Sequence, residues 1–173
     1  MTRLKITCLL IFMLAFGLTV YLLFSERKLP ANIKVHRLVV YKSRREMVAL
    51  AKGSVVKTYM ISLGGQSIGR KEFEGDMKTP EGLYFINTKN AKSGYHKNLG
   101  ISYPNKFDIE KAKRLGRPAG GDVKIHGLRN GAGFIGKLHR CCDWTLGCIA
   151  VTDQEIDELY NAVNIGTPIE IIP

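Results

Sequence analysis

The pattern of hydrophobic and polar positions divides the chain into two parts. Residues 6–24 contain no charged residue, and an apolar helix of about 20 residues is long enough to cross the hydrocarbon core of a membrane. From residue 33 onward, short runs of apolar and β-branched residues alternate with turns, which is typical of strands. The sequence therefore predicts a transmembrane helix over residues 1–24, a short tether over 25–32 and one folded domain over 33–173.

Two fates are open for the N-terminal segment. A cleaved signal peptide needs a shorter apolar core and small residues at its cleavage site, and the residues from Phe24 to Lys28 offer no such site. An uncleaved signal anchor is therefore favoured over cleavage. Arg3 and Lys5 precede the apolar run, and positive charge of this kind stays in the cytoplasm. We expect a single-pass membrane protein whose folded domain lies outside the cytoplasm.

The folded domain is predicted to be mainly β, with a few short helices. Three strands with short connections, at 34–41, 47–51 and 55–63, predict an antiparallel meander. Further strands are predicted at 83–86, 98–103, 122–126 and 169–172. A helix is predicted at 107–115 and another after a capping box formed by Thr152 and Glu155. Residues 87–93 and 127–142 are predicted to be loops.

Composition narrows the range of partners. The net charge is +11 at pH 7, but the basic residues are scattered, and no basic strand interleaved with aromatic residues predicts a nucleic-acid partner. The charge fits an ordinary basic surface, or attraction to an anionic surface such as lipid head groups or cell-wall polymer. Four cysteines are too few and too clustered for a disulfide framework.

The candidate chemistry centres on Cys148, which directly follows Gly147 at the start of a short apolar run. A thiol is mostly protonated at neutral pH and needs a nearby base to become a nucleophile. His126, at the end of a predicted strand, is the first candidate base. No acidic residue follows it, so the carbonyl of Gly127 is expected to hold its second ring nitrogen. The N–H groups of Gly147 and Cys148 are candidates for an oxyanion hole.

Alternatives remain open on residue types alone. Cys148 and His126 can be ordinary packing residues, and His139 is a second candidate base. Zinc is disfavoured, because the adjacent Cys141 and Cys142 do not have the spacing of a structural site. One of these two cysteines could instead form a disulfide with Cys148. We expect neither a metal nor a cofactor.

Two motifs resemble a known family. The run Ile125-His126-Gly127, a glycine-rich spacer and then Thr145-Leu146-Gly147-Cys148 is similar to the signature of L,D-transpeptidases with a YkuD-type catalytic domain. Thr79-Pro80-Glu81-Gly82-Leu83-Tyr84 resembles a second hallmark of that family. The resemblance covers roughly residues 34–172 and favours Cys148 as the nucleophile over the packing alternative.

The resemblance implies a β-sandwich-like catalytic domain, monomeric, in the cytoplasmic membrane of a bacterium and facing the periplasm. It also implies a reaction, in which Cys148 attacks the carbonyl that precedes the terminal D-Ala of a peptidoglycan tetrapeptide stem. An amine acceptor then takes the acyl group. A carboxypeptidase or hydrolase that trims stems or wall-linked proteins is the alternative with the same cysteine, and a non-catalytic wall-binding module is the alternative without it.

The sequence departs from the family pattern at two positions beside the cysteine. Leu146 stands where many members have His, and Ala150 where many have Arg or Asn. A cation at position 150 would hold a substrate carboxylate, so we assign that role to Arg129. Thr145, Gly147 and His139 complete the predicted substrate-binding and oxyanion residues.

Overall fold

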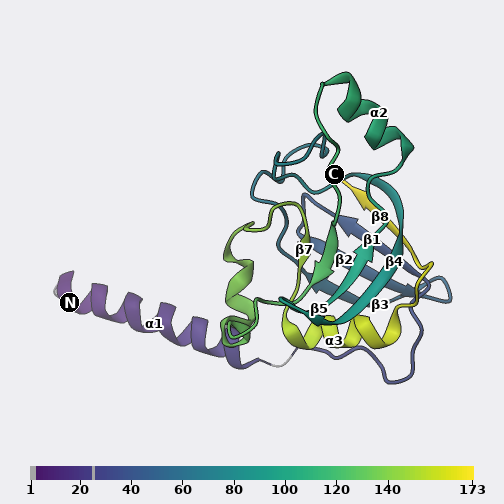
Figure 1. The fold of residues 1–173 in the computed structure, drawn as a ribbon. Coiled ribbons are helices and arrows are strands. Elements are labelled where there is room, and N and C mark those ends of the chain that lie inside the picture. Colours follow the sequence, from purple (N-terminus) through teal and green to yellow (C-terminus); the bar gives the residue numbers. More distant parts are fainter. Residues whose placement is uncertain (1–2, 25) are drawn as a thin grey trace.

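The computed structural model describes residues 3–24 and 26–173 (Figure 1). Its helices are α1 (Arg3–Leu23), α2 (Lys106–Arg114), α3 (Asp153–Ala162) and the 3₁₀ helix η1 (Gly133–Cys141). Its strands are β1 (Arg37–Tyr41), β2 (Glu46–Ala51), β3 (Ser54–Met60), β4 (Gly82–Ser93), β5 (His96–Ile101), β6 (Lys124–His126), β7 (Ile149–Ala150) and β8 (Pro168–Ile172).

The strands form one curled sheet of eight strands in the order β3-β2-β1-β8-β4-β5-β6-β7. The predicted meander is confirmed, because β1 pairs antiparallel with β2 and β2 with β3. The C-terminal strand β8 then lies between β1, to which it is parallel, and β4, to which it is antiparallel. This strand joins the two halves of the domain into a single sheet. The predicted strands and few short helices are present, but the fold is mixed α/β with one curled sheet, which corrects the prediction of a mainly β, sandwich-like domain.

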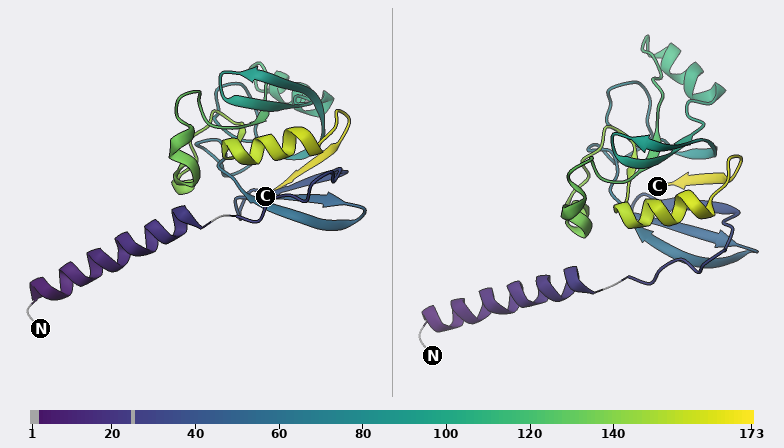
Figure 2. Two further views of the ribbon diagram at one scale, coloured as in Figure 1. Left: turned by 90° about the horizontal axis from the view of Figure 1, so that it is seen from below. Right: turned by 60° about the horizontal axis from the view of Figure 1, so that its bottom comes forward.

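The core lies between the curled sheet and α3, which runs across the sheet in both views of Figure 2. Strand β2 alternates buried and half-buried residues, as its period-two pattern predicts. Ile156 and Leu159 of α3 are fully buried, three residues apart on the apolar face of the helix. The helix begins at the predicted capping box, in which Thr152 and Glu155 bond to each other's backbone N–H. The apolar pattern of the sequence thus places the sheet and the helix that support the site.

Two predicted loops contain regular structure. Residues 87–93 continue strand β4, which pairs with β5 as far as Ser93. The glycine-rich segment 127–142 contains η1, which is kinked at Gly136 (φ 48°). A strand that is exposed on both faces carries polar side chains without a period-two apolar pattern, so the sequence does not reveal it. Kinked 3₁₀ turns likewise have no characteristic sequence period. These two elements nevertheless shape the site, because β4 leads to one of its walls and η1 leads to another.

The N-terminal segment forms the helix α1. Within residues 3–24 and 26–173, no helix is both long enough and apolar enough to cross a membrane. The structure thus does not support the predicted transmembrane helix over residues 1–24, of which Met1 and Thr2 lie outside the described residues. Figure 1 shows α1 extending away from the domain. The boundary between tether and domain at residue 32 stays a prediction.

The segment after α1 contacts the domain at η1. Arg140 pairs with Glu26 at 2.5 Å and with Glu155 of α3 at 2.8 Å. The hydrogen bond from Arg140 lowers the pKa of Glu26 to about 2, so the carboxylate stays charged at neutral pH. Arg140 is only 8% exposed, and it ties η1 to both the tether and α3. These ion pairs hold η1 in place, and residues 144–148, which line the site described below, follow soon after it in the chain.

Candidate active site

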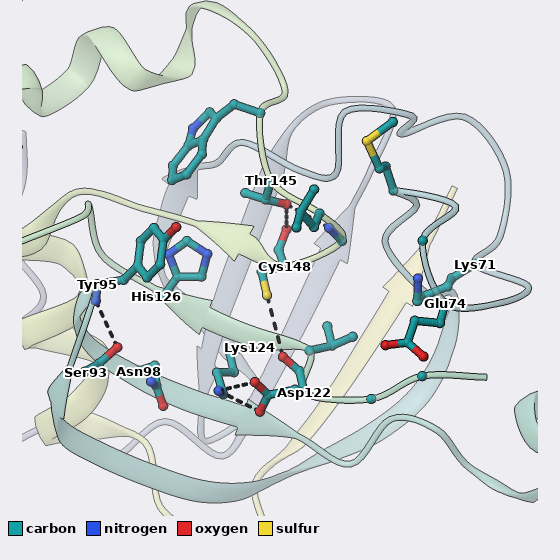
Figure 3. A pocket seen from close by; sticks show the side chains of 18 residues that line it. Lys71, Glu74, Ser93, Tyr95, Asn98, Asp122, Lys124, His126, Thr145 and Cys148 are labelled. Carbon is teal, nitrogen blue, oxygen red and sulfur yellow. Dashed lines mark hydrogen bonds and ion pairs between the residues drawn. The ribbon is translucent and has the colours of Figure 1, made fainter. Parts of the chain in front are cut away.

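A cavity of about 630 Å³ opens on one side of the sheet. Its walls come from four segments that are distant in sequence: 71–77, 93–98, 120–126 and 144–148. Cys148 and His126 both line it, together with Thr145 and Gly147 (Figure 3). The structure thus brings together four of the residues that the sequence predicted for a catalytic site.

Strand pairing explains why Cys148 and His126 line the same cavity. Strands β6 and β7 are parallel neighbours in which Ile125 lies opposite Ile149 and His126 opposite Ala150. Cys148, the residue before β7, is therefore level with Lys124 at the start of β6, and residues two apart on a strand, such as Lys124 and His126, face the same side. Both strands are nearly fully buried, so their packing holds the two residues in a fixed relation.

The turn that presents Cys148 is locked by Thr145. Its hydroxyl accepts a hydrogen bond from the Gly147 N–H at 3.1 Å and donates one to the Cys148 carbonyl at 2.7 Å. The N–H of Gly147 is thus engaged within the turn, and its role as an oxyanion donor stays a prediction. Of the two predicted donors, the Cys148 N–H is the one that the turn leaves for a substrate. Thr145 shapes the site by bonding to the backbone.

Gly147 is required by the shape of this turn. Its φ is +131°, a region that only glycine adopts readily. A Cβ at this position would lie 2.7 Å from the carbonyl oxygen of Lys78, closer than atoms can pack. The glycine therefore allows the Cys148 turn to lie directly on the backbone of the neighbouring loop.

His126 makes the contact expected from the sequence. Its Nδ1 lies 2.7 Å from the carbonyl oxygen of Gly127. A carbonyl only accepts, so Nδ1 carries the proton and Nε2 keeps its lone pair in the neutral ring. This is the tautomer that a general base needs. The catalytic role of the pair stays a prediction.

Burial sets the charge state of both residues. Burial lowers the pKa of His126 below its ordinary 6.5, despite the hydrogen bond from its ring to Gly127. Burial raises the pKa of the Cys148 thiol above 9, and the backbone N–H and charge of Lys124 only partly offset it. At neutral pH the resting pair is therefore a thiol and a neutral imidazole, not a thiolate–imidazolium ion pair.

Two aromatic side chains that sequence reasoning did not assign form one wall of the site. The ring of Tyr95 lies 4.7 Å from that of His126, and Trp144 lies 5.8 Å from His126. Tyr95 comes from the tight turn between β4 and β5, and nothing local in the sequence marks it. Trp144 had a signal, as the single tryptophan of the chain, four residues before the cysteine. The apolar rings shield His126 from water, which is the burial that lowers its pKa.

Trp144 is held in place by its neighbour Asp143. The Asp143 carboxylate accepts hydrogen bonds from the Leu63 N–H at 3.0 Å and from Arg45 at 2.7 Å. The Gly65 N–H and the Thr145 carbonyl add a backbone hydrogen bond at 2.9 Å. These contacts anchor the segment after η1 to the loop that follows β3, and they fix the wall that Trp144 forms.

The structure does not bring His139 and Arg129 to the cavity. His139 is buried behind Trp144, and its Nδ1 lies 3.2 Å from the Ser62 hydroxyl. Burial lowers the pKa of His139 to about 4, so the ring is neutral and packs against the wall. Arg129 is exposed and does not line the cavity. Neither residue is placed to touch a substrate there.

The other cysteines also lie outside the cavity. Cys141 and Cys142 are exposed at the end of η1, with their sulfur atoms 3.8 Å apart. Neither lines the cavity with Cys148. Among the described residues, no group of three or more His, Cys, Asp and Glu side chains is arranged to hold a metal ion. The thiol of Cys148 is free and half-buried.

Comparison with known proteins identifies relatives for most of the folded part. Residues 35–171 match the YkuD family, described as the L,D-transpeptidase catalytic domain. YafK of Escherichia coli (strain K12), provisionally named an L,D-transpeptidase, is 30% identical over 111 residues, which are 63% of this chain and 37% of YafK. The chain thus spans little more than a third of the length of the curated relatives that it matches.

Solved structures show the same fold. The helical cell shape determining protein Pgp2 from Campylobacter jejuni superposes with a TM-score of 0.58 at 23% identity, over 81% of this chain and 48% of Pgp2. Bd1075 from Bdellovibrio bacteriovorus gives a TM-score of 0.57 at 23% identity, over 83% of this chain and 49% of that protein. At these identities the likeness concerns the fold.

Proposed function

Because this chain belongs to the L,D-transpeptidase catalytic domain family, we propose that it is a cell-wall L,D-transpeptidase with Cys148 as its nucleophile and His126 as its base. The observation that carries the proposal is the cavity of about 630 Å³ that His126 lines from β6 and Cys148 lines from the turn just before the neighbouring β7. Peptidoglycan stem peptides are the substrate class that the family implies. Their location puts the reaction on the extracytoplasmic side of the bacterial cell membrane.

The proposed first half-reaction makes a thioester. Nε2 of His126 accepts the thiol proton as the sulfur of Cys148 attacks the carbonyl before the terminal D-Ala. The carbonyl π electrons move to its oxygen, and the Cys148 N–H donates a hydrogen bond to that oxyanion. When the carbonyl reforms, the C–N bond breaks, and the leaving amine takes the proton from His126. The products are a Cys148 acyl-enzyme and free D-Ala.

In the second half-reaction an amine attacks the thioester. His126 accepts its proton and returns it to the departing sulfur, so the enzyme regains its thiol and its neutral imidazole. Water in place of the amine would make the same site a carboxypeptidase. The largely apolar wall of Tyr95 and Trp144 favours an organic acceptor by limiting the access of water to the thioester.

The test follows both half-reactions. The full chain is incubated with a tetrapeptide stem, with and without a second stem as amine acceptor, and the products are identified by mass spectrometry. We expect release of D-Ala, a mass adduct on the peptide containing Cys148, and a cross-linked product that depends on the acceptor. Tripeptide as the main product with the acceptor present would indicate a hydrolase. Absence of both an adduct and any product would exclude acyl transfer.

The acidic side of the pH dependence of this reaction follows from the lowered pKa of His126. The neutral imidazole is the active form, and its pKa is lowered, so protonation stops the reaction only below pH 6.5. We expect acylation to stay constant near pH 7 and to fall as the pH drops below about 6.5. Acylation is measured as thioester formation under single-turnover conditions. His126→Gln should lower the rate and remove this acidic limb, and an acidic limb that survives this change would show that another group is the base.

A further inference from the structure

A buried cation lines the cavity at a position that no sequence motif marked. The side chain of Lys71 is only 5% exposed, yet it belongs to the lining of the cavity together with Cys148. Figure 3 shows it on the far side of Cys148 from His126. Its Nζ lies 3.9 Å from where a Cβ of Gly147 would be. The positive charge therefore lies against the residue that directly precedes the proposed nucleophile.

The loop around Lys71 holds its ammonium group in a fixed place. The Nζ donates to Asp76 at 2.7 Å and to the Phe73 carbonyl at 3.0 Å. Asp76 is itself 5% exposed at its side chain and accepts hydrogen bonds from three backbone N–H groups, those of residues 72, 73 and 78. Because the carboxylate cannot move, the lysine bound to it is preorganised, and no entropy is lost in ordering it for a ligand.

The ammonium retains one donor for a ligand. A lysine has three N–H donors, and the described residues supply the two acceptors named above. A buried N–H that lines a cavity and has no protein partner is costly unless a ligand or water accepts from it. The chemical group that fits a cation in a poorly hydrated site is an anion with an oxygen acceptor.

The other basic residues near the site fit this role less well. Lys124 also lines the cavity, but its side chain is 29% exposed and its partner Asp122 is 81% exposed, so solvent screens the pair. Arg129, which the sequence suggested for this role, is exposed and lies outside the cavity. Ala150 is fully buried in β7 and offers no charge.

We propose that Lys71 binds a carboxylate of the acyl-donor peptide and thereby selects donors that carry a negative charge beside the bond to be cleaved. The inference rests on the proposed function, because it takes the cavity as the donor site. A tetrapeptide stem offers this group in two places, at its C-terminus and on an acidic side chain of its third residue. The two sources share one chemistry, and the experiment separates them.

The experiment measures binding without turnover. The full chain with Cys148→Ala is titrated by calorimetry with a tetrapeptide that carries both carboxylates, with its C-terminal amide, and with a peptide that has lysine as its third residue. Losing the recognised carboxylate should weaken binding roughly 10- to 100-fold, the range for a hydrogen bond between charged groups. Adding Lys71→Met should weaken binding of the peptide with both carboxylates by the same factor. It should leave the affinity for the peptide without the recognised carboxylate unchanged.

Three controls separate recognition from a structural role. Lys71→Arg should restore most of the discrimination, and Lys124→Met should leave it intact. If Lys71→Met prevents folding, as seen in the thermal melt, the double variant Lys71→Met/Asp76→Asn removes both buried charges and takes its place. An equal loss for all three peptides, or discrimination that depends on Lys124, would overturn the proposal, and so would a failure of all peptides to bind. Discrimination that persists while the Cys148 adduct is never seen would retain the carboxylate site and refute the transferase.

Discussion

Replacing Cys148 by alanine should abolish the acyl-enzyme and lower tetrapeptide turnover at least about a thousandfold, the scale seen when a nucleophile is removed. The physical reason is that no other described thiol lines the cavity, so no neighbouring sulfur can take its place. The fold should survive, because the thiol is half-buried and its Sγ makes a long 3.8 Å contact with the Asp122 carbonyl beside the Lys124 N–H. The measurement is the single-turnover rate of D-Ala release, together with the mass of the protein.

The matched control for this prediction is Cys142→Ala. Cys142 is an exposed free thiol outside the cavity, so its loss should leave both adduct and turnover unchanged. Iodoacetamide provides a second readout. Treating the protein without substitutions should block acylation only when Cys148 itself is alkylated. Turnover that persists in Cys148→Ala but disappears in Cys142→Ala would show that the nucleophile is Cys142 and not Cys148.

The sequence predicted those parts of the fold that depend on local pattern. The alternation over 47–51, the turn before Leu83 and the capping box at Thr152 all lie where expected, since each is a property of a few neighbouring residues. The place of β8 between β1 and β4 was not predictable in this way. It depends on which distant edges pair, and no local residue type specifies that choice. The sandwich prediction was wrong for this reason.

The same distinction applies to the site. His126, Gly127 and Cys148 were candidates on sequence alone, because a reactive residue beside a glycine is visible in a short stretch of sequence. Lys71 was not, because its burial depends on Asp76 and on a loop that packs against a turn more than 60 positions later in the chain. Arg129 lies close to His126 in sequence, which made it the predicted cation. Burial along that segment ends at Leu128, however, so Arg129 is already exposed to solvent. Proximity in sequence was a poor guide to the charge of the cavity.

Replacing Gly147 by alanine should both destabilise the domain and stop the reaction. A side chain at φ +131° is strained by about 1–3 kcal/mol, and the contact of 2.7 Å with the Lys78 carbonyl forces one of the two backbones to move, which costs about 1–3 kcal/mol more. The free energy of unfolding should fall by roughly 2–6 kcal/mol in urea titrations. Acylation should be lost even in the folded fraction, because the turn that carries Cys148 can relax only by shifting away from Lys78.

Gly131→Ala separates the clash from the strain. Gly131 also has a positive φ, +85°, but a Cβ there meets no atom within 4 Å. It should lose only about 1–2 kcal/mol of stability, the cost of a left-handed residue, and keep its acylation rate. If the two alanine variants lost equal stability and both retained acylation, the close packing of the Cys148 turn on the Lys78 backbone would not be what positions the thiol. A loss of acylation confined to Gly147→Ala would show that positioning Cys148 requires a glycine before it, where the turn packs on the Lys78 backbone.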